Sequence, residues 1–157
     1  MSENEDSSIY KIYQIKILGE GVNSVIRIGC EIFVLNNDNI LLGKRKNCYG
    51  AGEWGLPGGH LEYNEKLVDA ATRELKEELG IEATDLRICC IVDDVEGNKH
   101  YIHVAFVLTR YNGNIELLEP DKCEEWRFFD QKKLPPNVFS AHKKIIEAFL
   151  LQKMYYN

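Results

Sequence analysis

The residues best able to do chemistry in this chain are glutamates and one arginine, held at fixed spacing between positions 59 and 81. A glycine is followed after five residues by a glutamate, and after seven more by an Arg-Glu pair, a Glu-Glu pair and a second glycine: Gly59, Glu65, Arg73, Glu74, Glu77, Glu78 and Gly80. Carboxylates crowded in this way repel one another unless a cation is present. Hard oxygen ligands at this density suit Mg²⁺ or Mn²⁺ bound together with substrate phosphates.

The segment that carries these glutamates predicts an amphipathic helix over residues of about 65 to 79. Its apolar residues recur at helical spacing: Leu67, Val68, Ala71, Leu75 and Leu79. Asn64 is a good N-cap, and the glycine after the helix suits a left-handed C′ position. On this helix Glu74, Glu77 and Glu78 are related as i, i+3 and i+4, so their carboxylates project from one side.

The whole motif resembles the Nudix box, which marks a family that hydrolyses nucleoside diphosphates linked to another group. The resemblance implies an α/β fold, the Nudix α/β/α sandwich with a mixed β-sheet. It also implies catalytic support by Arg73 and Glu65, which occur at the spacing that the family uses for an ion pair bracing the catalytic helix. The simpler alternative for an acidic triplet is a solvated helix face, and this ion-pair spacing counts against it.

The resemblance further implies a metal site that binds Mg²⁺, with Mn²⁺ as a possible substitute. Glu74 and Glu78 would hold the ion with the Gly59 carbonyl, while Glu77 would supply a further ligand or activate water. The preceding residues, Pro57-Gly58-Gly59, favour the same interpretation. Glycine carries no side chain, so the backbone there can approach a metal or a phosphate closely.

Outside the box, most of residues 27 to 137 is similar to nucleoside triphosphate diphosphatases that act on modified purine nucleotides and dCTP. The similarity lies in short stretches: 42–46, 50–52, 56–62, 99–102 and 119–126. It implies hydrolysis of a nucleoside triphosphate to the monophosphate and pyrophosphate. Two alternatives remain open: hydrolysis of ADP-ribose or a nucleoside diphosphate sugar at the same metal site, and a catalytically silent Nudix fold that senses nucleotides. The silent fold predicts eroded box glutamates, whereas here all are present.

The same similarity implies six substrate contacts, at Arg45, Leu56, Gly59, His103, Phe139 and Ser140. The fork of Arg45 could contact phosphate oxygens, with an exposed strand cation as the alternative. His103 falls where related enzymes use a small polar residue near the base. Relatives often carry Phe-Trp before the last helix, where this chain has Phe139-Ser140; the missing indole removes a base-stacking surface, so a purine preference does not carry over. Trp126 is interpreted as a core or interface aromatic.

Composition narrows the class of protein. The net charge of −6, from 25 acidic and 19 basic residues, argues against a protein that coats nucleic acid. The expected partner is a small nucleotide, with a homodimer possible. Five cysteines form an odd number without metal-finger spacing, and the chain shows neither a secretory signal nor an apolar run of membrane-spanning length. These features predict a reduced cytoplasmic protein without a membrane partner.

The remaining pattern predicts a single Nudix domain over residues 9–157, after a polar tail over residues 1–8 that is expected to be disordered. Ile- and Val-rich runs separated by turn residues predict two hairpins, over 27–45 and 86–110, and short strands near 54–56 and 125–129. Apolar residues at helical spacing predict a final amphipathic helix over 137–153.

Overall fold

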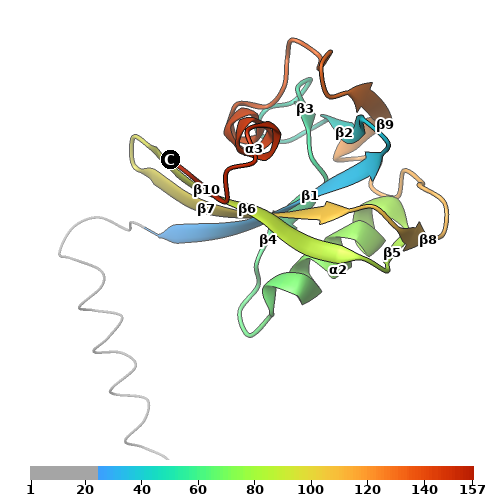
Figure 1. Cartoon of the computed structure of the whole chain (residues 1–157), viewed down its shortest axis with the longest axis horizontal. Helices are drawn as coiled ribbons and strands as arrows, with labels where there is room; N and C mark the ends of the chain where they lie inside the picture. The colour runs from blue at the N-terminus through green and yellow to red at the C-terminus, as the bar shows by residue number, and fades with distance from the viewer. Residues whose placement is uncertain (1–24) are drawn as a thin grey trace, which may run out of the picture.

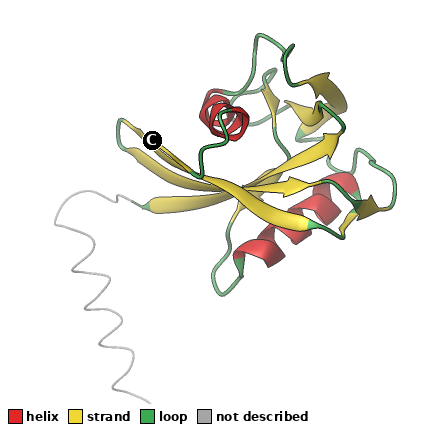
Figure 2. Ribbon diagram, in the orientation of Figure 1, coloured by secondary structure: helices red, strands yellow, loops and turns green. Residues whose placement is uncertain are grey.

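A twisted β-sheet with one helix on each face forms the part of the chain that the computed structural model describes, residues 25–157 (Figures 1 and 2). Helix α2 (Leu67–Leu79) covers one face and helix α3 (Ser140–Leu150) covers the other. The strands are β1 (Ile26–Asn36), β2 (Asn39–Arg45), β3 (Trp54–Gly55), β4 (Gly58–His60), β5 (Glu82–Ala83), β6 (Leu86–Glu96), β7 (Lys99–Leu108), β8 (Tyr111–Asn112), β9 (Cys123–Asp130) and β10 (Tyr155–Tyr156). The expected α/β/α sandwich is confirmed, and the tail predicted over residues 1–8 lies outside the described residues.

Strand β1 is the central element of the sheet. It runs parallel to β7 and antiparallel to both β2 and β4, so the sheet is mixed, as expected. The strand order is β10-β6-β7-β1-β2-β3, with β9 paired to β2; β5 and β8 form a separate two-stranded sheet. Both predicted hairpins are confirmed by antiparallel pairing, of Leu35 with Ile40 in the first and of Leu86 with Leu108 in the second.

Two hydrophobic cores lie on opposite faces of the sheet. Alternation along β1 sends Ile32 toward α2 and Phe33 toward α3, and both side chains are fully buried. Leu75 of α2 and Ile145 of α3 complete the two cores from the helices. Burying a side chain of this size contributes about 2 kcal/mol. Neither helix in the described residues is long and apolar enough to span a bilayer.

Helix α2 begins two residues later than predicted. Lys66 is the N-cap, without a side-chain capping bond, and Asn64 adopts a left-handed conformation with φ of 64° instead of capping the helix. The reason is that Glu65 is held outside the helix, where its carboxylate accepts a hydrogen bond from the Glu62 N–H (3.1 Å). The C-terminal prediction holds, because Gly80 ends the helix with φ of 71°.

Helix α3 is shorter than the predicted span of 137–153. Asn137 ends a turn and Val138 forms a parallel bridge with Trp54: the Trp54 N–H donates to the Asn137 carbonyl (2.9 Å), and the Phe139 N–H donates to the Trp54 carbonyl (2.8 Å). The helical spacing of apolar residues carries no information about this pairing with β3. The helix was therefore predicted to start too early. The pairing positions Phe139 at the start of α3, beside the glycine loop that contains Tyr49 and Gly50.

Strand β4 connects β3 to the acidic helix and was not predicted, because Gly-Gly-His has little strand propensity. Pairing with β1 imposes its conformation, with Cys30 opposite Gly59 and Glu31 opposite Gly58. Gly58 has φ of 140°, and a Cβ atom there would overlap the Cys30 carbonyl oxygen. Only glycine can therefore bring this backbone against β1.

Replacing Gly58 with alanine tests this close approach. We expect the free energy of unfolding to fall by about 3 kcal/mol or more, because backbone strain and overlap with Cys30 add together. Gly97→Ala is the matched control: its φ is 59°, and an added Cβ meets nothing within 4 Å. That variant should lose only about 1–2 kcal/mol. Equal losses in urea denaturation would show that packing against β1 does not require Gly58.

Candidate active site

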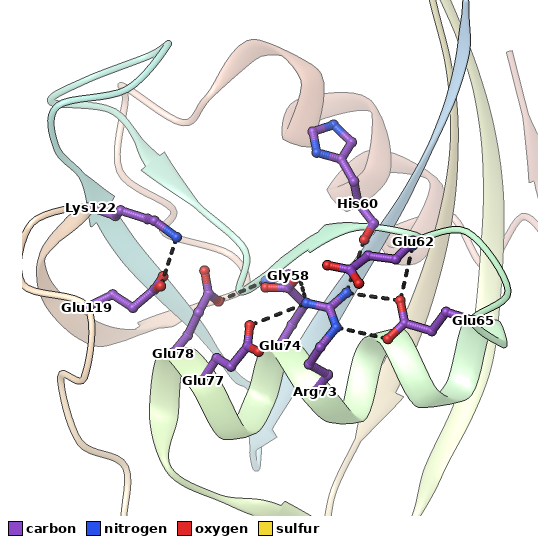
Figure 3. A network of polar contacts seen from close by, with 10 residues as sticks. All are labelled: Gly58, His60, Glu62, Glu65, Arg73, Glu74, Glu77, Glu78, Glu119 and Lys122. Carbon is purple, nitrogen blue, oxygen red and sulfur yellow. Dashed lines mark hydrogen bonds and ion pairs between the residues drawn. The ribbon is translucent and has the colours of Figure 1, made fainter.

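Arg73 is the hub of a polar network at the edge of α2 (Figure 3). Its Nε and Nη2 atoms donate to the two carboxylate oxygens of Glu65 (2.8 and 3.0 Å). Its Nη1 atom donates to Glu74 (2.6 Å) and, more weakly, to Glu77 (3.3 Å), and Nη2 also reaches the His60 carbonyl (3.2 Å). One guanidinium therefore ties the helix to the β4 loop, using the bidentate geometry that arginine provides.

The electrostatics of this network follow from the same bonds. Hydrogen bonding to Glu65, and then to Glu74, raises the pKa of Arg73, while the bond from Arg73 lowers the pKa of Glu65. Arg73 retains only 24% and Glu65 only 15% of side-chain exposure. The Arg73–Glu65 pair predicted from the sequence is thus present in the structure, and it stays ionised in a partly buried setting.

The backbone of β4 lies directly against two of the acidic side chains. The Gly58 N–H donates to Glu78 Oε2 (3.0 Å). A Cβ atom on Gly59 would overlap the carboxylate of Glu74. The two glycines therefore let the main chain, including the Gly59 carbonyl, share one site with Glu74 and Glu78.

Negative charge is concentrated where these groups meet. Burial is the main cause that raises the pKa of Glu78 to about 8, and the charges of Glu74 and Glu119 add to it. Burial also raises the pKa of Glu74, with Arg73 opposing and Glu77 and Glu119 adding. Carboxyl groups whose pKa is raised in this way are costly to ionise without a nearby cation.

The donor set fits a hard divalent cation, although the carboxylates are turned toward other partners. Within residues 25–157, no three His, Cys, Asp or Glu side chains converge closely enough to ligate an ion. Glu74 is engaged by Arg73, and Glu78 by the Gly58 N–H. Their oxygens and the Gly59 carbonyl are the ligand types that Mg²⁺ prefers, and a cation there would offset the repulsion that raises both carboxyl pKa values.

A cavity of about 460 Å³ opens beside these carboxylates. Glu74, Glu78 and all six predicted substrate contacts line it: Arg45, Leu56, Gly59, His103, Phe139 and Ser140. Glu77, Arg73 and Glu65 are not among its lining residues, and the Glu77 side chain is 53% exposed. The structure therefore brings two of the three helix glutamates to the cavity and leaves Glu77 on the outer side.

Arg45 lies at the cavity with most of its fork already engaged. Nε and Nη2 both donate to the Tyr49 carbonyl (3.0 and 2.9 Å), and the guanidinium lies over the Phe139 ring, 4.3 Å from its centre. The Tyr49 ring in turn meets Phe139 edge to face. Arg45 thus fastens the glycine loop to the start of α3, and Nη1 is the remaining part of its fork.

His142 lies on α3 and lines the cavity, although the sequence pattern did not mark it as a site residue. Its Nδ1 accepts a hydrogen bond from the Leu56 N–H (2.9 Å). Burial lowers the pKa of His142 to about 3, with smaller effects from the charges of Arg45 and His103. The ring is therefore neutral, and because Nδ1 is the acceptor, its proton is on Nε2.

Three further cavity residues were not anticipated as site residues: Glu31, Glu119 and Trp126. Glu119 is paired with Lys122 (2.8 Å), and its charge reaches both Glu74 and Glu78. Trp126 packs partly against the core, as interpreted, but it also faces the cavity. A signal existed for Glu31, which is the one acidic residue of β1, lies in its apolar middle and is 5% exposed.

Comparison with known proteins identifies the family. The NUDIX domain profile matches residues 26–149, so the chain belongs to the NUDIX family. Together with the fold and the acidic helix, this match defines a Nudix hydrolase, an enzyme that acts on the phosphoanhydride bonds of nucleotides. Nudix hydrolases generally use divalent metal ions.

Relatives of this chain carry different substrate names. It is 37% identical over 123 residues to an ADP-ribose pyrophosphatase of Methanocaldococcus jannaschii, covering 76% of this chain and 71% of the relative. It is 32% identical over 126 residues to an oxidized purine nucleoside triphosphate hydrolase of Danio rerio, covering 78% of each. Among solved structures, a MutT NUDIX hydrolase from Burkholderia pseudomallei superposes with a TM-score of 0.74 at 33% identity, covering 78% of this chain and 97% of that one.

Replacing Arg73 with lysine tests the hub. Lysine keeps the charge but cannot bind both Glu65 oxygens and Glu74 at once, so the helix loses its tie to the β4 loop. We expect nucleotide turnover to fall about 10- to 100-fold. The control is Arg87→Lys, because Arg87 is 68% exposed in its pair with Asp85 and should leave turnover unchanged. Full turnover in Arg73→Lys would show that charge alone braces the helix.

The pKa of Glu78 predicts a pH dependence of stability in the metal-free protein. Since its pKa rises from 4.5 to about 8 on folding, the folded state holds a proton that the unfolded chain has lost between these values. Stability should therefore fall as pH rises through that window, by up to about 1 kcal/mol per pH unit. Urea denaturation in EDTA should show this slope, and Glu78→Gln should reduce it to the part that Glu74 contributes. Glu82→Gln, at an exposed position, is the control and should keep the full slope. An unchanged slope in Glu78→Gln would show that Glu78 is not its source.

Proposed function

We propose that this Nudix hydrolase converts a nucleoside triphosphate to the nucleoside monophosphate and pyrophosphate, using Mg²⁺. The observation that carries the proposal is one cavity with an acidic end, formed by Glu74, Glu78 and Glu119, and an aromatic side that includes Trp126 and Phe139. The acidic end suits a cation with phosphates, and the aromatic side suits a base.

The acidic end of the cavity would perform the bond cleavage. Glu74, Glu78 and the Gly59 carbonyl are proposed to hold the metal, with Glu119 as a further carboxylate. A bound Mg²⁺ would neutralise phosphate charge and make attacking water more acidic. Arg73 keeps Glu74 in place from behind. Glu77 lies outside the cavity, so a direct role for it requires its side chain to turn away from Arg73.

Cations in the cavity wall, placed among six carboxyl groups, favour a substrate with several phosphates. Three cations line the wall: Arg45, Lys99 and Lys122. Lys122 lies beside the acidic cluster, where its charge lowers the pKa of Glu78, and Lys99 lies over the Tyr49 ring (4.4 Å). Three cations together with a metal ion match a triphosphate better than a diphosphate ester, which carries less charge.

A second candidate function is the cleavage of ADP-ribose or a nucleoside diphosphate sugar. The relative named an ADP-ribose pyrophosphatase, at 37% identity, favours it. The same acidic end would serve this reaction, because both substrates contain a phosphoanhydride. A nucleotide panel with Mg²⁺, with products separated by ion exchange, distinguishes the two. Faster cleavage of ADP-ribose than of every triphosphate would replace the first proposal with the second.

Replacing Glu78 with glutamine tests the metal assignment. The amide keeps the shape of the side chain but cannot provide an anionic ligand, so we expect kcat/KM for the best triphosphate to fall at least about 100-fold. Excess EDTA should abolish activity in the unaltered enzyme, and added Mg²⁺ should restore it. Glu82→Gln serves again as the exposed control. Wild-type kcat/KM in Glu78→Gln at saturating Mg²⁺ would remove Glu78 from the metal site.

A further inference from the structure

Three buried polar side-chain atoms lack a hydrogen-bond partner among residues 25–157: Glu31 Oε2, His103 Nε2 and Trp126 Nε1. All three residues line the cavity of the active site. Buried polar atoms in folded proteins are nearly always paired, because an unpaired one forfeits its hydration without replacement. Such atoms gathered at one cavity indicate that a bound molecule supplies the missing partners.

Two of these atoms belong to a single buried pair. His103 Nδ1 lies 2.7 Å from Glu31 Oε1, and the two residues are 4% and 5% exposed. They stand on β7 and β1, and Gly29 lies directly opposite His103 in the parallel register. A Cβ atom on Gly29 would overlap the Glu31 carboxylate, so a glycine at that position leaves room for the pair.

Tyr101 and Glu31 together fix the orientation of the His103 ring. The Tyr101 ring stacks on His103, with 8° between the ring planes and 5.5 Å between their centres. Since a carboxylate can only accept, His103 Nδ1 donates to Glu31 Oε1. Burial lowers the pKa of His103, but the hydrogen bond and charge of Glu31 outweigh it, so the net shift is upward and favours a proton on Nε2 as well. The cavity wall therefore presents a carboxylate oxygen that can accept beside an imidazole nitrogen that is favoured as a donor.

A purely structural role does not account for this arrangement. A buried charge pair contributes little net stability, and the half of each group that is left unpaired makes the arrangement less favourable still. Phosphate is also a poor match, because the free oxygen of Glu31 would repel it. A neutral ring that offers an N–H beside an acceptor atom would satisfy both groups.

We infer that Glu31 and His103 read the base of the nucleotide, with a base N–H donating to Glu31 Oε2 and a neighbouring base acceptor receiving the His103 Nε2–H. This inference rests on the proposed function and adds the means of base recognition to it. The side of the base that pairs in duplexes has this donor–acceptor arrangement. A base without it would leave two buried charged groups unpaired and should bind weakly.

Deletion analogues of the base test the inference. The best of the four ribonucleoside triphosphates is compared with its analogue that lacks the base N–H: purine riboside triphosphate for ATP or GTP, and 2-pyrimidinone riboside triphosphate for CTP or UTP. In the unaltered enzyme we expect the analogue to raise the Michaelis constant about 10- to 100-fold. In Glu31→Gln that ratio should fall to within about threefold of one, because the amide can place a donor where the carboxylate accepted.

The matched control is Asp93→Asn, which breaks a similar pair on the neighbouring positions of β6 and β7. Asp93 lies 2.9 Å from His100, and neither residue lines the cavity. This variant should leave the analogue ratio unchanged. A second variant, His103→Gln, keeps a neutral donor and should lower the ratio less than Glu31→Gln does. It also preserves a test if the first variant folds poorly.

A binding measurement separates this inference from the proposed function. Calorimetry of the nucleoside monophosphate and its analogue, with metal-free protein, needs neither Mg²⁺ nor turnover, and the same 10- to 100-fold preference should appear in the dissociation constants. If no triphosphate is cleaved but this preference is found, only the proposed function fails. Equal binding of base and analogue, or the same preference in Glu31→Gln, overturns the inference. The inference is also overturned if removal of a ribose hydroxyl weakens binding to the unaltered protein but not to Glu31→Gln, because the pair would then contact the sugar.

Discussion

The structure depends on one guanidinium that holds several carboxylates in place. Helix α2 has to carry acidic side chains close together, and their mutual repulsion would splay them in the absence of a cation. Arg73 resolves this conflict by binding Glu65 with two nitrogens and Glu74 with the third, while it also reaches the backbone of β4 at His60. The Arg73 guanidinium thus holds Glu74 from the side away from the cavity, while Glu74 and Glu78 still line the cavity, where an exchangeable cation could bind.

Glycines supply the complementary constraint on the backbone side. Gly58 and Gly59 press β4 between β1 and α2, so the main chain itself contributes to the site. The cost of this arrangement is visible in the raised pKa values of Glu74 and Glu78, which burial makes hard to ionise. Ionising these two buried carboxyl groups therefore lowers the stability of the fold. Such a trade between stability and activity is common in enzymes.

Local patterns predicted the parts of this fold whose determinants are local. Helical spacing located α2 and Gly80, and turn residues located both hairpins. The rest depends on partners distant in sequence. Glu65 leaves the helix because Arg73 binds it, residues 137–139 pair with Trp54, and Glu31 meets His103 from 72 positions away. His103 was expected near the base from resemblance, but its partner was not, since no local pattern joins two strands across a sheet.

Strand β1 also fixes a length. Its residues 30 and 31 pair with Gly59 and Gly58 on one edge, and residue 31 carries the carboxylate that bonds His103 on the other. Neighbouring strands in a sheet lie about 4.8 Å apart, and this spacing cannot stretch. The gap between the proposed metal-binding end and the proposed base-binding end is therefore fixed by the sheet. A molecule with the right chemical groups but one more phosphate between them would exceed that gap, so the proposed site would select ligands by length as well as by charge.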